Sequence, residues 1–189
     1  AVGFDLYCQL LEEAVQKLRH QRGETTMEVT PAASAPAAPV ELTVDTFLSD
    51  EYIPDAALKM EIYHRLMAAG DLKEVENIAS EMLDRYGRPP GAAQNLLSLT
   101  RVRLLAQEIG VTGVQQKGKE IELNFGQQHN LRGEKLIQLT QYFPHKLNFS
   151  SAGGLTIRVR VAGLDQQGML ALLEDILTRI KHLVAEAVS

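Results

Sequence analysis

Three charged residues at helical spacing, Glu81, Asp84 and Arg85, have the types and positions in this chain that best suit reversible binding chemistry. Residues three and four positions apart share one side of an α-helix, and an acid followed four residues later by a base is the favourable order for pairing. Glu74 and Asn77 fall on the same side, so these five polar residues span an arc of about 100°. Such a face can form charge-assisted hydrogen bonds with a partner protein. The same spacing also fits a simpler alternative, a local surface ion pair between Glu81 and Arg85 that stabilises the helix by a few tenths of a kcal/mol.

One apolar residue, Ile78, is expected beside these charges. On a helical projection it falls about 60° from Glu81, next to Arg85 and apart from the main apolar stripe. An apolar residue among charges is typical of the centre of a protein contact. Alternatively, a neighbouring loop covers it.

A second group of charges is basic and lies in the later part of the chain. Arg158 and Arg160 alternate with Ile157 and Val159, so the two arginines share one face of a predicted strand. With nearby cations they predict either a nucleic-acid-binding patch or an ordinary solvated sheet face. The net charge of −5 argues against a dominant nucleic-acid surface. The other members of this group are Lys117, Lys119, Arg132, Lys135 and Lys146.

The sequence contains none of the motifs that mark common catalytic or cofactor sites. There is no GxxxxGK[ST] loop, no GxGxxG after a strand and no HExxH. Cys8, the single cysteine, lies among apolar residues and is interpreted as a small core residue rather than a nucleophile. The five histidines are scattered over different elements, at His20, His64, His129, His145 and His182. We therefore predict no catalytic, cofactor-binding or metal-binding residues in this chain, and we expect it not to be an enzyme.

Glu81 lies on a predicted helix whose two ends are indicated by capping and helix-breaking residues. Asp71 is a suitable N-cap, Gly87 suits a left-handed position after the last turn, and Pro89-Pro90 cannot continue the helix. The predicted apolar stripe comprises Leu72, Val75, Ala79, Met82, Leu83 and Tyr86.

The surrounding elements predict an α+β fold. A helix over 55–69 forms a hairpin with the helix over 71–86, and a largely apolar third helix follows over 91–109. The period then changes to two, which predicts antiparallel hairpins over 111–125 and 146–161 with a short helix over 132–143 between them. A further strand is predicted over 41–47 and a closing amphipathic helix over 165–187.

The first thirty-nine residues differ in character from the rest. Residues 3–20 predict an amphipathic helix, and residues 21–39 form a Pro/Ala-rich linker with no periodicity. The domain prediction is therefore 1–20, 21–39 and 40–189. The chain has no apolar run long enough to cross a membrane and no signal peptide, and a single cysteine fits a reducing, cytoplasmic compartment. Because it lacks an initiator Met, we expect a fragment of a longer protein.

Three segments taken in series carry a family resemblance. VGFDLYCQLLEEAV, DEYIPDAALKMEIYHRL and EMLDRYGRPP resemble the C-terminal part of the bacterial transcription-repair coupling factors, the Mfd family. The resemblance implies a parent that is an ATP-dependent translocase on duplex DNA, with ATP and magnesium bound in its motor domains. Such a parent removes stalled RNA polymerase and recruits the repair protein UvrA. Residues 1–20 would be the tail helix of the motor module, and 40–189 the C-terminal regulatory (TRCF) domain.

The resemblance also implies a role for the charged helix face. The family's contact motif matches Glu81, Asp84 and Arg85, with Ile78, Glu74 and Asn77 as additional candidates. They would contact a UvrB-like module of the same chain, mask the surface that UvrA needs, and thereby inhibit the parent. The fragment is expected to be monomeric, with no membrane partner. A nucleic-acid-binding accessory module using Arg158 and Arg160 remains the alternative.

Overall fold

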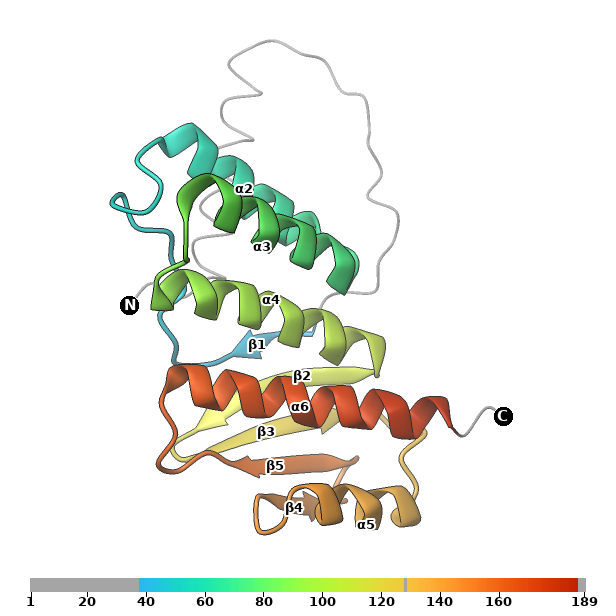
Figure 1. The fold of residues 1–189 in the computed structure, drawn as a ribbon. Helices are drawn as coiled ribbons and strands as arrows, with labels where there is room; N and C mark the ends of the chain where they lie inside the picture. The colour runs from blue at the N-terminus through green and yellow to red at the C-terminus, as the bar shows by residue number, and fades with distance from the viewer. Residues whose placement is uncertain (1–37, 128, 187–189) are drawn as a thin grey trace.

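A computed structural model describes residues 38–127 and 129–186 (Figure 1). The predicted tail helix over 1–20, with Cys8 and His20, and most of the linker lie outside the described residues. The described part is α+β, as predicted, and consists of β1 (Val40–Glu41), α2 (Ala56–Ala68), α3 (Leu72–Tyr86), α4 (Gly91–Glu108), β2 (Val111–Lys117), β3 (Glu120–Phe125), α5 (Gly133–Tyr142), β4 (Leu147–Ser150), β5 (Thr156–Arg160) and α6 (Gln166–Ala185).

The five strands form one sheet in the order β1-β2-β3-β5-β4. Both predicted hairpins are confirmed: β2 pairs with β3, and β4 pairs with β5, each antiparallel. The two hairpins join because β3 also pairs with β5. Alternation along β3 and β5 places one row of side chains, including Ile121 and Ile157, in the core, and leaves the other row on the opposite face of the sheet.

The strand predicted over 41–47 is wrong for most of its length. Only Val40–Glu41 pairs with β2, in parallel. Beyond it, side chains replace the backbone ladder: Thr43 N donates to Gln116 Oε1 at 2.9 Å, and Asp45 N donates to Gln166 Oε1 at 3.0 Å. The segment leaves the sheet edge to reach the helical layer, where Leu48 is buried. Its alternating, β-favouring sequence could not reveal this change of direction.

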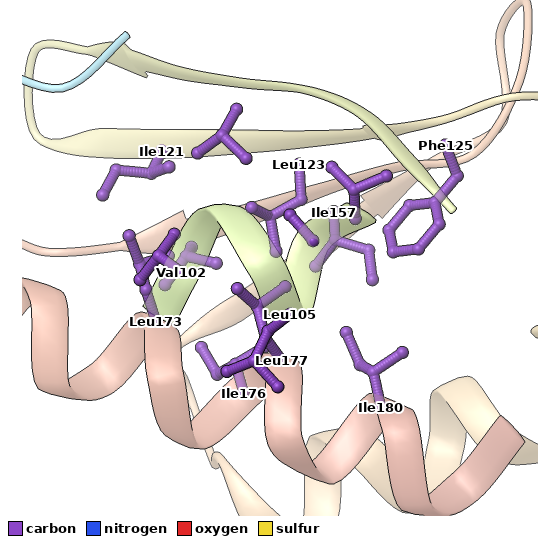
Figure 2. Close-up of a cluster of buried hydrophobic side chains, with 14 of the residues drawn as sticks. Val102, Leu105, Ile121, Leu123, Phe125, Ile157, Leu173, Ile176, Leu177 and Ile180 are labelled. Atoms are coloured by element: carbon purple, nitrogen blue, oxygen red, sulfur yellow. The ribbon is translucent and has the colours of Figure 1, made fainter. Parts of the chain in front are cut away.

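The main core lies between the sheet and the pair α4 and α6 (Figures 1 and 2). Apolar residues from both helices meet the inward row of the strands, and each fully buried Leu or Ile contributes about 1.5–3 kcal/mol. The labelled side chains in Figure 2 are Val102, Leu105, Ile121, Leu123, Phe125, Ile157, Leu173, Ile176, Leu177 and Ile180.

A second core lies on the other side of α4, where α2 and α3 pack. Ile53, Leu66, Val75, Met82 and Leu96 are all fully buried there. Because α4 contacts the sheet layer on one side and the α2–α3 pair on the other, its apolar residues are buried around most of its circumference. This confirms the prediction that the third helix is the buried one, and it fixes the α2–α3 pair at the outside of the domain.

Candidate functional site

The ends of α3 are set by the residues that the sequence predicted. Asp71 Oδ1 accepts a hydrogen bond from Glu74 N at 2.9 Å, and Gly87 has φ +78° while its N–H donates to Leu83 O. A left-handed φ at this position favours glycine because other residues carry a Cβ that clashes there. These caps fix where α3 begins and ends.

Glu81 lies between two arginines on the outward side of α3. Its Oε1 accepts from Arg85 Nη1 at 2.9 Å, as the spacing predicted, and its Oε2 accepts from Arg65 Nη1 at 2.6 Å. Arg65 is on α2, and sequence reasoning missed it. The only available signal was the short connection between the two helices, which sets Arg65 opposite the first turns of α3 in an antiparallel pair. We call Arg65, Glu81 and Arg85 the Glu81 triad.

The two arginines change the electrostatics of Glu81. Hydrogen bonds from Arg65 and then Arg85 hold the pKa of the Glu81 carboxyl below its usual value. The carboxylate in turn raises the pKa of the Arg85 guanidinium. All three side chains are one third to one half exposed, so solvent screens both pairs and keeps them weak. Such contacts are weak enough to exchange with those of a partner.

The remaining polar residues of α3 flank the triad. Asp84 is exposed, and none of the ion pairs of the described residues includes it. Glu74 Oε2 accepts from Gly70 N at 2.7 Å. Glu74 and Asn77 also line a surface hollow of about 300 Å³ that is completed by Arg65, Ala68, Ala69 and Ile78. The predicted polar face therefore exists, and it borders a concave surface.

Of the two alternatives for Ile78, an exposed position among these charges is wrong, and the residue is covered, by helix packing rather than by a loop. Ile78 is 4% exposed and packs in the second core, whereas Leu83, which was predicted to be buried, is 53% exposed. The buried arc of α3 runs from Val75 through Met82 to Ile78, because α2 covers one flank of the helix. Ile78 falls about 40° from Met82 on the helix, and Leu83 falls about 100° from it. Ile78 therefore forms the floor of the hollow and no part of an exposed contact.

Acids lie among the seven basic residues of the predicted patch. Glu122 lies between two of them, with Lys117 Nζ at 2.6 Å from Oε2 and Arg158 Nε at 3.2 Å from Oε1. These contacts hold the pKa of the Glu122 carboxyl below its usual value, the contact with Lys117 first. Arg160 is registered opposite another acid, Glu120. Lys135 instead donates to the backbone of α6, so the sheet face is mixed in charge rather than basic.

The histidines of the described residues do not form a cluster of metal ligands with acids or cysteine. His182 and Asp175 line one hollow of about 380 Å³ with Arg179, whose guanidinium lies 3.8 Å from the centre of the Tyr142 ring. His182 and Asp175 are seven residues apart on α6, which is about 10 Å along the helix axis and too far for a direct acid–base pair. Among the described helices, none is long and apolar enough to cross a membrane.

Comparisons with known proteins give consistent matches. The family model of the TRCF domain matches residues 42–136. The transcription-repair-coupling factor of Staphylococcus haemolyticus is 34% identical over 143 residues, which are 75% of this chain and 12% of that protein. The corresponding protein of Haemophilus influenzae is 32% identical over 144 residues, 76% of this chain and 12% of that protein. The chain thus spans about an eighth of the length of these relatives.

A solved structure shares the fold. It is a crystal structure of the C-terminal domain of a transcription-repair coupling factor, and it superimposes with a TM-score of 0.73 at 20% sequence identity. The match covers 79% of this chain and 96% of that one.

Proposed function

This chain belongs to the TRCF domain family, and from that premise we propose that residues 40–189 are a non-catalytic, autoinhibitory domain of a transcription-repair coupling factor. The domain would bind a UvrB-like module elsewhere in the same parent chain and mask the surface through which that module recruits UvrA. The family resemblance supports this assignment.

The proposal assigns the activities of the parent protein to modules outside this chain. ATP and magnesium would be bound by motor domains outside this chain, which move on duplex DNA and act on stalled RNA polymerase in the cytoplasm. Residues 1–20 would be the tail helix of that motor module. This chain would act on those activities only through contacts with other modules.

The observation that carries the proposal is the rigid presentation of a charged face. Glu81, Asp84 and Arg85 lie on α3, whose two ends are capped and whose opposite side is buried against α2 and α4. Interfaces bind with less loss of entropy when their contact groups are already oriented. We include Glu74 and Asn77 in the proposed contact and leave out Ile78, since it is buried.

Weak ion pairs suit a switch. A contact made of screened charge pairs costs little to break, so a competitor with modest differential affinity can shift the equilibrium. A linker that joins the two modules would make the closed contact intramolecular and raise its effective concentration. Autoinhibition would then hold in the free parent and yield when a stronger partner engages.

The test is a double charge reversal, Glu81→Lys with Asp84→Lys, in the full-length parent. UvrA binding and basal ATP hydrolysis should both rise, by about tenfold if the coupling lies in the usual range of 1–3 kcal/mol. The matched control is Glu120→Lys with Glu122→Lys, which reverses two acids on the sheet face. Wild-type levels of both activities in the first variant would refute the autoinhibitory contact.

The nucleic-acid alternative has less support. Arg158 and Arg160 do share the exposed sheet face, but each lies opposite an acid, Glu122 and Glu120. Clustered cations without neutralising acids are what phosphate binding requires. Salt-dependent binding of the chain to duplex DNA, lost on Arg158→Gln with Arg160→Gln, would restore this alternative.

A further inference from the structure

Arg65 lies where it can reach either of two acids on α3. Its Nη1 is 2.6 Å from Glu81 Oε2. Helices α2 and α3 are joined by residues 69–71 alone, so Arg65, three residues before the end of α2, is level with Val75, three residues after the start of α3. Along the axis of α3, Glu74 is about 1.5 Å and Glu81 about 9 Å from the level of Arg65. Because the Arg65 guanidinium already reaches Glu81, the nearer Glu74 is also within its reach.

The space on the Glu74 side is open. The hollow of about 300 Å³ is lined by Arg65 and Glu74 together with Ala68, Ala69 and Ile78. The small side chains of the two alanines, at the C-terminal end of α2, leave this volume free beside the guanidinium. Glu74 uses Oε2 to accept from Gly70, and the hydrogen bonds of the described residues leave its Oε1 unused. A second carboxylate acceptor for Arg65 is therefore already present.

Both oxygens of Glu81 are occupied in the free domain. A cation from a partner would meet two guanidiniums already at this carboxylate, and like charges at short range repel. Arg85 is the more firmly held, because it also lies over the Tyr86 ring at 5.3 Å and belongs to the same helix as Glu81. Arg65 is the group that has an alternative position.

The surroundings favour a cationic partner group. Four acids, Glu61, Glu74, Glu81 and Asp84, lie on the segments of α2 and α3 that carry Arg65 and Arg85. Glu61 is close enough to Arg85 to contribute to the raised pKa of that guanidinium. Complementary charge selects partners and speeds association.

We propose that Arg65 is a two-position latch: it occupies Glu81 in the free domain and moves into the hollow to Glu74 when a guanidinium or ammonium group of the partner takes its place on Glu81. This inference rests on the proposed contact with the UvrB-like module and adds a residue and a mechanism to it. Arg65 acts as an internal competitor that keeps the contact weak. Glu74 holds the displaced arginine so that its charge is not left unpaired.

A double-mutant cycle tests the latch. The 189-residue chain carrying Arg65→Gln, Glu74→Gln, both or neither is titrated with the separately expressed UvrB-like module. Arg65→Gln removes the competitor and should tighten binding about two- to fivefold. Glu74→Gln removes the second acceptor and should weaken binding about two- to fivefold more when Arg65 is present than when residue 65 is Gln.

The cycle separates the latch from general electrostatics. If Glu74 merely attracted a basic partner, Glu74→Gln would weaken binding equally in both backgrounds, and that additive result overturns the latch. Arg88→Gln is the matched control because it removes the same charge from beyond the end of α3, and it should change the dissociation constant less than Arg65→Gln does.

A third variant, Glu81→Gln, separates the latch from the function on which it rests. Loss of binding in this variant together with an additive cycle would leave the proposed contact intact and refute only Arg65. Unchanged binding in Glu81→Gln and in Asp84→Asn would refute the contact itself, and the latch with it.

Discussion

Two carboxylates in this domain, Glu81 and Glu122, each lie between two cations, and they differ in what holds those cations. Glu122 is bracketed by Lys117 and Arg158 and has a side chain 16% exposed. Glu81 is bracketed by Arg65 and Arg85 and has a side chain 33% exposed. Both pKa values are lowered for the same reason, since each acid accepts hydrogen bonds from two cations.

Backbone register fixes the sheet triad. Arg158 is directly opposite Glu122, and Lys117 is two residues along β2 from the residue opposite it. Each of these positions follows from ladder hydrogen bonds that cannot shift by one residue without moving a whole row of side chains to the other face. Only the docking of two helices places Arg65 on Glu81, beside a hollow that offers another acid. The same chemical group is thus structural on the sheet and able to exchange partners on the helix.

The largest effect on this comparison is expected from removing a core side chain of α3. Ile78→Ala is expected to lower the free energy of unfolding by about 2–5 kcal/mol, because it leaves a cavity in the second core. Leu83→Ala, on the same helix, should change it by less than about 0.5 kcal/mol, since Leu83 is exposed. Urea denaturation of both variants is the measurement. Similar losses of unfolding free energy at the two positions would contradict the observed burial.

A smaller effect is expected from the cap of α3. Asp71→Ala removes the acceptor of Glu74 N and should cost about 1 kcal/mol. The loss should loosen the first turn of α3, which carries Glu74, and leave β3 unaffected. Amide hydrogen exchange of the two elements distinguishes this outcome from a uniform loss of stability. Asp165→Ala provides a matched control at the cap of α6.

The pH dependence of stability sharpens the comparison further. Because Glu81 and Glu122 have lowered pKa values in the folded state, their contributions are fully present above the usual value of 4.5 and are lost as the pH falls through the folded pKa. Glu81→Gln and Glu122→Gln should each remove a few tenths of a kcal/mol at pH 7 and flatten this acid loss. Thermal unfolding between pH 3 and about pH 7 measures this loss of stability at acid pH. Unchanged acid loss in both variants would show that neither triad contributes.

The contribution of Glu174, on α6, to the pH dependence of stability should have the opposite sign and be the smallest of these effects. Burial raises the pKa of its carboxyl, and Arg101, whose Nη1 lies 3.8 Å from it, only partly offsets that. A raised folded pKa means that the contribution of this group is present below 4.5 and is lost as the pH rises through the folded value. Glu174→Gln should therefore leave stability at pH 7 unchanged or raise it by up to about 0.5 kcal/mol. A clear loss would mean that the Arg101 pair outweighs the cost of burial.

The parts of the fold that local sequence governs were predictable. Asp71 and Gly87 bound α3 within one residue of the predicted ends, because caps act on the adjacent turn. Alternation predicted both hairpins, since a period of two is a property of each strand alone. The pairing of Glu81 with Arg85 also followed from spacing within one helix.

Contacts between elements could not be predicted in this way. A helical projection of α3 takes no account of α2, and so it placed Ile78 outside and Leu83 inside. The segment after Glu41 has a strand-like pattern, but the buried position of Leu48 in the second core draws it away from the sheet edge.

What the sequence by itself determined is therefore the type, order and ends of most elements, together with the face of α3 that carries Glu81, Asp84 and Arg85. These depend on interactions within a few residues. Only the tertiary structure decided that Arg65 joins Glu81, that Ile78 is covered, and that Glu122 neutralises Lys117 and Arg158. Those outcomes depend on which elements pack together, and the free energy of that packing is spread over the whole core rather than carried by any one segment.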